Sequence, residues 1–161
     1  MKNFLIALLI VASSAQALAK TPDLLGIYVI GILTNNLSKS ESKQKNFIDA
    51  VSPSGDYRVI RNAIAVNGTE TYLSSWTSSD GVYIADVATF CAAKSGLLET
   101  IDVRGVTYDA CKISGTHEGQ TFDAWYTKKV PFGVVKEIAV ANPTEPDPFI
   151  QTYEVTEFGV K

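Results

Sequence analysis

Cys91 and Cys111 are the residues for which number and spacing leave the fewest possible chemical roles. They are the only two cysteines of the 161-residue chain and lie 20 positions apart. A zinc site needs three or four Cys, His or carboxylate ligands, and this sequence has no CxxC pair and one distant histidine. In an oxidising compartment an even number of cysteines usually forms disulfides. We therefore expect a Cys91–Cys111 disulfide, with a metal or redox site as the less favoured alternative.

The remaining reactive side chains form no catalytic pattern in the sequence. His117 is the only histidine and stands beside Glu118 in a glycine-flanked turn sequence. A general base needs a nucleophile within hydrogen-bond reach and a third group that orients it. No serine occurs in a nucleophile-elbow context, and phosphate-loop, dinucleotide and calcium-loop spacings are missing. The sequence predicts no enzymatic activity, no metal and no cofactor; a hydrolytic enzyme is the least favoured reading.

Aromatic side chains indicate a binding function instead. The chain contains two Trp, seven Tyr and seven Phe. A curved sheet that carries Trp and Tyr on its concave face can hold an apolar ligand. The candidate ligand-lining residues are Trp76, Tyr83, Trp125, Tyr126 and Phe132.

Trp125 is out of phase with Phe122, Ala124 and Tyr126, so both faces of its expected strand are aromatic. A monomer rarely leaves such a patch bare. Residues 24–33 or a bound apolar molecule could cover it. We favour the chain's own segment.

Residues 1–19 have the features of a secretory signal. Lys2 gives a basic start, residues 4–12 are apolar but too short to span a bilayer, and residues 17–19 form a small-x-small cleavage site. No cysteine follows that site, which argues against a lipid anchor; an uncleaved N-terminal membrane anchor is the alternative. The sequence predicts export to the periplasm, or secretion, and one mature domain of residues 20–161 without a transmembrane segment.

The charge balance excludes one class of partner. The chain has 14 basic and 17 acidic side chains, a formal net charge of −3, and the two signs are scattered. Nucleic-acid-binding domains carry a basic patch or stripe. Nucleic acid is therefore not an expected partner.

Alternation of apolar and polar residues predicts strands along most of the chain. The expected strands are residues 24–33, 47–51, 58–66, 69–76, 82–91, 101–104, 108–113, 121–126, 134–141 and 149–155. Asn67-Gly68 and residues 115–119 predict hairpin turns, and the three prolines of residues 142–148 predict a loop. Residues 34–46 read as a solvated loop, with a binding lid as the alternative.

This spacing of strands and turns, without a clear amphipathic helix, predicts a fold class. We expect a mainly β protein (all-β or α+β), built as a curved antiparallel sheet or incomplete barrel of about eight to ten strands with one disulfide. The stretch from 82 to 91 would then close a meander of three strands. Segment 24–33 could also be a buried helix, but its glycines and β-branched residues favour a strand.

Residues 98–136 contain a characteristic set of strand and corner residues. The set consists of Glu99, Thr100, Val103, Gly105, Cys111, Trp125, Tyr126, Val130, Pro131, Phe132, Gly133 and Lys136. The stretch resembles the C-terminal half of small exported bacterial envelope proteins with the fold of the lipoprotein carriers (LolA-like). The resemblance implies an incomplete antiparallel barrel around a hydrophobic hollow.

Two functions are therefore expected. The first is a non-catalytic periplasmic protein that binds a lipid, another amphiphile or an apolar segment on a curved sheet. The second is a structural or interaction subunit of an envelope complex that docks through a sheet edge or through loop 142–148.

Overall fold

The computed structural model describes residues 23–65 and 67–161, so the expected signal peptide, residues 1–19, lies outside the described residues. The described chain forms a single nine-stranded sheet in the order β4-β3-β2-β1-β9-β8-β7-β6-β5, and every neighbouring pair is antiparallel. The strands are β1 (Ile27–Asn35), β2 (Glu41–Val51), β3 (Tyr57–Ile64), β4 (Glu70–Thr77), β5 (Leu97–Val103), β6 (Val106–His117), β7 (Gln120–Tyr126), β8 (Val134–Ala141) and β9 (Phe149–Val160). The expected mainly β class with one antiparallel sheet is confirmed.

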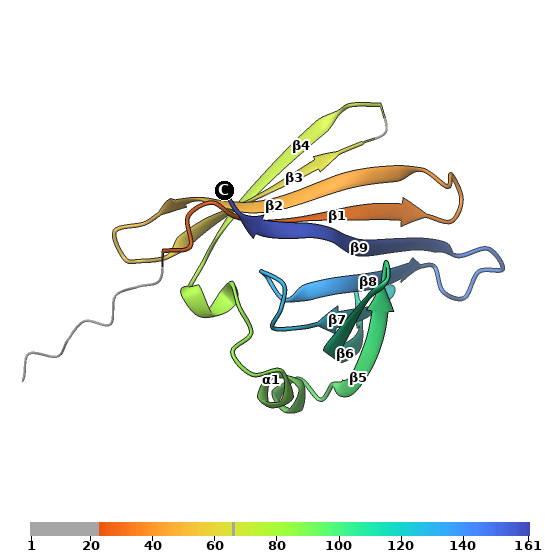
Figure 1. The fold of residues 1–161 in the computed structure, drawn as a ribbon. Helices are drawn as coiled ribbons and strands as arrows, with labels where there is room; N and C mark the ends of the chain where they lie inside the picture. Colours follow the sequence, from red (N-terminus) through yellow and green to blue (C-terminus); the bar gives the residue numbers. More distant parts are fainter. Residues whose placement is uncertain (1–22, 66) are drawn as a thin grey trace, which may run out of the picture.

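The sheet is open but strongly curved (Figure 1). Register shifts interrupt the β2–β3, β1–β9 and β7–β8 pairs, and such bulges increase twist and bend a strand. The tip of the β5–β6 hairpin curls back until Arg104 Nε lies 3.4 Å from Glu154 Oε2 of β9. Strands β7 and β8 lie between β6 and β9 in the sheet order. The contact therefore shows that the sheet curls enough to bring the β5–β6 hairpin against β9.

Two hairpins of the curled half turn on two residues each. Arg104 and Gly105 have φ of 53° and 81°, and Glu118 and Gly119 have φ of 50° and 79°. Positive φ at both central residues is the geometry that matches the right-handed twist of the flanking strands. The β6–β7 turn is therefore shorter than the predicted loop 115–119, since β6 continues through His117.

The prediction of a loop or lid at residues 34–46 is wrong for residues 34–35, which end β1, and for residues 41–46. Residues 41–46 belong to β2, which pairs with β1 and β3. The segment is polar because its lysines lie on an exposed sheet face. Lys45 Nζ is 5.5 Å from the Tyr28 ring centroid and 5.1 Å from that of Phe47. Long side chains of this kind cover apolar surface with their stems, so a lysine-rich strand can pass for a loop.

The prediction of a strand over residues 82–91, and with it the three-stranded meander, is also wrong. Residues 79–81 form a short 3-10 helix, η1 (Ser79–Gly81), and α1 spans Val87–Ala93. The Asp86 side chain accepts a hydrogen bond from the Thr89 N–H and caps α1. The three alanines of α1 favour a helix. A good cap and alanines outweighed the alternation of Tyr83, Ala85 and Val87.

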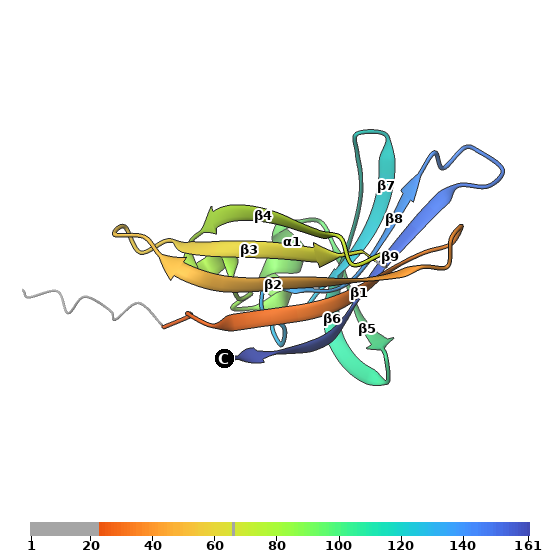
Figure 2. The ribbon, with the colours of Figure 1, turned by 90° about the horizontal axis from the view of Figure 1, so that it is seen from above.

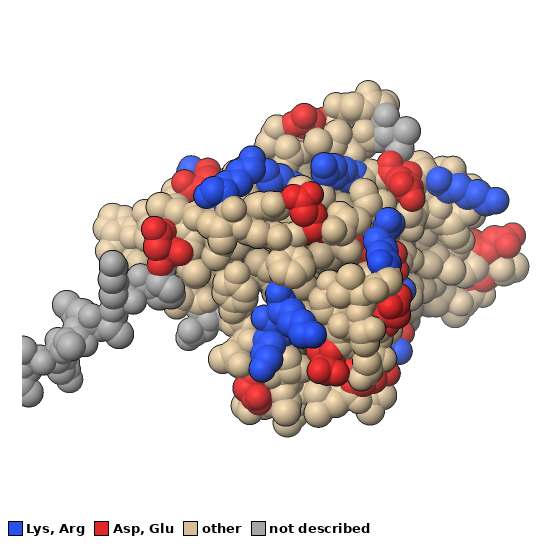
Figure 3. All heavy atoms as spheres, viewed as in Figure 1, with Lys and Arg blue, Asp and Glu red and all other residues tan. Residues whose placement is uncertain are grey.

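Cross-strand partners share a face of a sheet, so the pairing separates two faces. One face contains the row Lys112, Trp125, Lys136 and Glu154. The other, here called the inner face because Cys91 of α1 is bonded to it through Cys111, contains the row Ala124, Glu137, Tyr153 and Leu33. On the side of the molecule drawn in Figure 3, basic and acidic side chains lie next to one another.

Two apolar clusters form the core. The larger one gathers Val29, Val103, Tyr108, Ala110, Trp125, Val130, Val135, Tyr153 and Val155. The smaller one gathers Leu24, Ile27, Ile48, Tyr57 and Val82. Residues 27–33 form β1, which β9 and β8 separate from β7 in the sheet order, and Val29 of that segment belongs to the same core cluster as Trp125.

Candidate ligand-binding site

Residues 78–96, here called the crossover, connect edge strand β4 to the opposite edge strand β5. The crossover passes beside one end of the sheet and carries η1 and α1 (Figures 1 and 2). Its helix packs against β6 and β5. The crossover lies on the face of the sheet that contains Cys111 and Tyr126, since Cys91 of α1 is bonded to Cys111 and Tyr126 lines a cleft with crossover residues.

A disulfide fixes the crossover to the inner face. Cys91 of α1 is bonded to Cys111 of β6, with their Cα atoms 5.3 Å apart, as the sequence predicted. Both cysteines are buried. A Cβ on Gly96 would lie 2.4 Å from the Cys111 sulfur and 2.9 Å from the Cys91 sulfur, so only glycine fits beside the bridge.

A tight corner between β7 and β8 fixes the other end of the crossover. The Phe132 N–H donates to the Val82 carbonyl at 2.6 Å, and the Thr127 N–H donates to the Gly133 carbonyl at 2.8 Å. Phe132 has φ of +63°, a left-handed conformation that is uncommon outside glycine and costs about 1 kcal/mol or more. The corner thus holds a phenylalanine in a strained conformation against the crossover.

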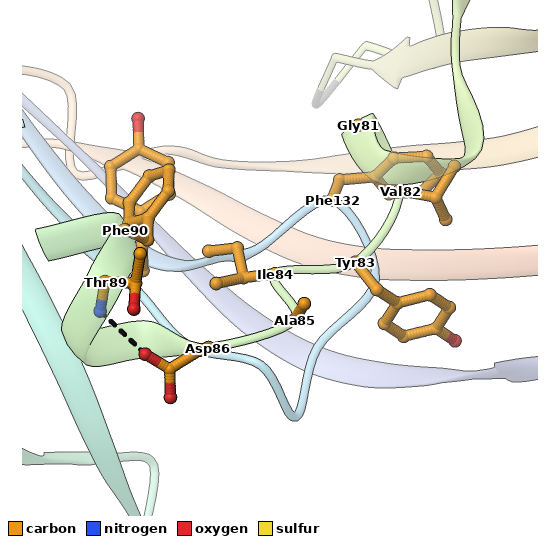
Figure 4. A pocket seen from close by; sticks show the side chains of 10 residues that line it. Gly81, Val82, Tyr83, Ile84, Ala85, Asp86, Thr89, Phe90 and Phe132 are labelled. Atoms are coloured by element: carbon orange, nitrogen blue, oxygen red, sulfur yellow. Dashed lines mark hydrogen bonds between the residues drawn. The ribbon is translucent and has the colours of Figure 1, made fainter. Parts of the chain in front are cut away.

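Between crossover and corner lies a cleft of about 500 Å³, here called the apolar cleft. Its lining side chains are mostly aliphatic or aromatic, and Figure 4 shows how they lie. They include Val82, Tyr83, Ile84, Phe90, Tyr126 and Phe132. The Phe90 and Tyr126 ring centroids are 5.2 Å apart, within the range of favourable aromatic pairs. Ligand sites of a few hundred Å³ commonly have such a lining.

Two further clefts each share a lining residue with the apolar cleft. Tyr126 also lines a cleft of about 370 Å³ that contains His117 and Glu137. Phe132 also lines a cleft of about 240 Å³, here called the polar cleft, which includes Arg61, Glu137 and Tyr153. The inner face therefore offers apolar and polar surfaces that meet at Phe132.

The structure brings three of the five predicted lining residues together. Tyr83, Tyr126 and Phe132 all line the apolar cleft. Trp76 lies on edge strand β4 and is 54% exposed. Trp125 is buried in the larger core cluster on the opposite face of the sheet, where its indole N–H donates to Glu99 and Lys112 Nζ lies 5.1 Å from its ring. The two tryptophans therefore lie away from the apolar cleft.

Sequence reasoning missed Val82, Ile84 and Phe90, because it treated residues 82–91 as a sheet strand. The available signal was Asp86 followed by an alanine-rich stretch, which is an N-cap before a helix. It also missed the polar cleft, since Arg61 and Glu137 come together only through the strand order. No local pattern marks such a pair.

The cleft tyrosines stay protonated at neutral pH. Burial, with a smaller effect of the Glu137 charge, raises the pKa of Tyr126 above its usual value. Burial also raises the pKa of Tyr153 to about 12. Both hydroxyls can therefore donate hydrogen bonds. The pKa of Asp86 is lowered, mainly by the hydrogen bond from the Thr89 N–H, which keeps a negative charge at the rim.

The single histidine of the chain is exposed at the β6–β7 turn and forms no catalytic group with the side chains of the clefts. His117 is 81% exposed at its side chain and lies 3.8 Å from Glu118. Among residues 23–65 and 67–161, no group of three or more His, Cys, Asp or Glu side chains could hold a metal ion. None of the helices described there is long and apolar enough to cross a membrane.

Comparison with known proteins adds no family. The chain matches no protein-family model, and a search of curated proteins found no significant match.

Proposed function

We propose that the protein is a non-catalytic periplasmic protein that binds a lipid or another amphiphile through its apolar part in the apolar cleft. The observation that carries this proposal is the cleft of about 500 Å³ with its aliphatic and aromatic lining. Its walls come from the crossover and from the β7–β8 corner, two segments held together by the Phe132–Val82 hydrogen bond. Burial of a ligand chain against such walls is favourable at about 25 cal/mol per Å² of apolar surface.

Two further features support this reading. The resemblance of residues 98–136 to the lipoprotein carriers implies a hydrophobic hollow inside an incomplete barrel. Tyr83 is 37% exposed, so part of the aromatic lining faces water when the cleft is empty. An apolar segment of an envelope partner would occupy the same cleft by the same chemistry.

The test is displacement of 1-anilinonaphthalene-8-sulfonate by palmitate. We expect saturable dye fluorescence that palmitate removes in the wild-type protein. Ala85→Arg adds a charged side chain to the cleft lining. It should weaken palmitate binding at least about tenfold, because a ligand chain in the cleft would then remove water from the guanidinium. Ala93→Arg, the same change at the exposed end of α1, should leave binding unchanged.

Equal affinities of both arginine variants and the wild type, or no displacement at all, would refute the proposal. Circular dichroism of each variant shows whether the fold is retained. Native mass spectrometry of the protein purified from periplasm would identify the bound species directly.

A second candidate function rests on a different observation. Edge strand β4 exposes Tyr72, Leu73 and Trp76 by 61%, 67% and 54%. An exposed edge can accept an extended segment of another protein as an added strand. In this reading the protein is an interaction subunit of an envelope complex. We prefer β4 to loop 142–148 because Asn36 holds the end of that loop through the Pro148 carbonyl at 2.9 Å and the Ile150 N–H at 2.8 Å.

In-cell photocrosslinking separates the two functions. A benzophenone amino acid in place of Tyr72 should give one specific adduct if β4 docks a partner. The same probe in place of Lys43, which is exposed on β2 and pairs with both β1 and β3, should give none. Equal adducts at both positions would argue against the docking function.

A further inference from the structure

The polar cleft combines one positive and one negative side chain that form no ion pair within the described part of the chain. Its charged lining residues are Arg61 and Glu137, and its polar ones include Gln44, Asn46 and Gln151. Arg61 is the only one of the three arginines without an ion pair among the described residues, whereas Arg58 pairs with Asp49 and Arg104 with Glu154. Within residues 23–65 and 67–161 Glu137 has no ion pair either.

The arginine is held in place but keeps donors to offer. Its Nε donates to Asn46 Oδ1 at 3.3 Å, and Asn46 is its cross-strand neighbour on β2. No described residue accepts a hydrogen bond from the two terminal nitrogens of Arg61. A guanidinium with its outer edge open is the geometry that binds a carboxylate or phosphate.

Tyr153 supplies a second, independent sign of a missing ligand. The residue is only 9% exposed, and its hydroxyl is buried without a hydrogen-bond partner among the described residues. Such a group costs about 1–3 kcal/mol. Glu137 is its direct cross-strand partner on β8, whereas the hydroxyl lies over Gly31 of β1, on the other side of β9. With its high pKa the hydroxyl remains a donor at neutral pH.

We infer that the polar cleft binds a zwitterionic group. An anionic phosphate or carboxylate would lie on Arg61 and the Tyr153 hydroxyl, and a primary ammonium would lie on Glu137. Equal numbers of positive and negative charges in the cleft favour a ligand that carries both signs, because a purely anionic or cationic ligand would leave one side chain unmatched. The volume of about 240 Å³ suits a headgroup rather than a whole lipid.

The place of this cleft indicates where the rest of the ligand lies. Phe132 lines both the polar and the apolar cleft. If a zwitterionic headgroup binds Arg61 and Glu137, an acyl chain attached to it begins next to the apolar cleft. The placement of the chain rests on the proposed function. The ligand class is a zwitterionic amphiphile with a phosphate and a primary amine. A free small zwitterion has the same head chemistry.

Isothermal titration calorimetry with four probes tests the inference. Lauroyl lysophosphatidylethanolamine has both charges and a chain, lauroyl lysophosphatidic acid lacks the ammonium, dodecylamine lacks the phosphate, and phosphoethanolamine lacks the chain. We expect the wild-type protein to bind the first probe at least about tenfold more tightly than the second and third, as expected for one charge-assisted hydrogen bond.

The variants assign each charge. Glu137→Gln should bring the affinities for the two lysophospholipids within about twofold of each other. Arg61→Gln should weaken both phosphate probes about tenfold and leave dodecylamine unchanged. Tyr153→Phe removes a hydroxyl that has no hydrogen-bond partner among residues 23–65 and 67–161, so it should weaken the phosphate probes without lowering the unfolding temperature.

Other results would contradict the inference in distinguishable ways. If neither Arg61→Gln nor Glu137→Gln changes the order of the probes, the headgroup site is wrong, even where Ala85→Arg still weakens every chain-bearing probe. If Ala85→Arg has no effect but phosphoethanolamine binds and Arg61→Gln abolishes that binding, the site is right for a free zwitterion and the amphiphile function fails. Failure of all four probes to bind overturns both.

Discussion

At the scale of single residues, Gly31 and Tyr153 show how closely the inner face is packed. A Cβ at Gly31 would lie 2.2 Å from Tyr153 Cε2 and 2.4 Å from its Cζ. The Tyr153 ring therefore lies directly over the β1 backbone, and a side chain at position 31 would overlap it. This contact fixes a wall of the polar cleft.

Gly31→Ala tests that contact. We expect a loss of about 1–3 kcal/mol in unfolding free energy, as for other overpacked sites, measured by urea denaturation. The same substitution in a Tyr153→Ala background should cost much less, because the clashing ring is gone. Equal costs in both backgrounds would mean that the two residues are not coupled.

Asp123 makes part of the stability depend on pH. Its carboxylate accepts a hydrogen bond from Ser114 at 2.5 Å and lies 2.9 Å from Lys112 Nζ. The Ser114 hydrogen bond first, and Lys112 second, hold the pKa of Asp123 below its usual range. A carboxyl with a depressed folded-state pKa stabilises the fold above its unfolded pKa of about 3.9. That contribution is lost as the pH falls through the folded-state value.

Asp123→Asn should therefore destabilise the protein at neutral pH and flatten the loss of stability below about pH 4. Urea unfolding midpoints measured from pH 7 to pH 2 give this curve. Asp147→Asn, in exposed loop 142–148, serves as the matched control. An unchanged acid branch in Asp123→Asn would show that this carboxylate is not the group that titrates.

At the scale of elements, the strands were predictable and the crossover was not. Residues 134–141 are mostly apolar and were expected to form a strand, and β8 spans Val134–Ala141. The cysteine count and the expected compartment predicted the disulfide. The crossover failed because seven-residue α1 is too short to show a helical period and has little intrinsic stability. Its structure depends on Cys111, the Phe132 hydrogen bond and other contacts that are distant in sequence.

Replacing both cysteines tests how far α1 depends on the disulfide. Cys91→Ala/Cys111→Ala should lower the unfolding free energy by roughly 3 kcal/mol, the chain-entropy estimate for a loop of this length. Amide exchange should rise first in residues 87–93, since β6 keeps its ladders to β5 and β7. Uniform exchange across the sheet and α1 would mean that the helix is held by packing instead.

At the scale of the whole molecule, an open sheet leaves two edges, and they differ. Strand β5 carries Glu99 and Asp102 and has α1 packed beside it. Strand β4 has one charged residue, Glu70, and pairs with β3 over eight residues without a bulge. Natural edges are usually protected by lysine, proline or bulges. The described sequence of β4 has none of these, so its free edge is open to another strand.

The purified chain should therefore pair with itself through β4 when no partner is present. Sedimentation velocity should show concentration-dependent association of the wild-type protein at about 100 µM, within the range where exposed edges associate. Ser74→Lys adds a charge between Tyr72 and Trp76 on the same face of β4 and should keep the protein monomeric. Thr152→Lys adds the same charge on β9 at a position paired with both β1 and β8, and should associate like the wild type. A wild-type protein that stays monomeric at every concentration, or equal behaviour of the two lysine variants, would show that the β4 edge is protected by something other than its sequence.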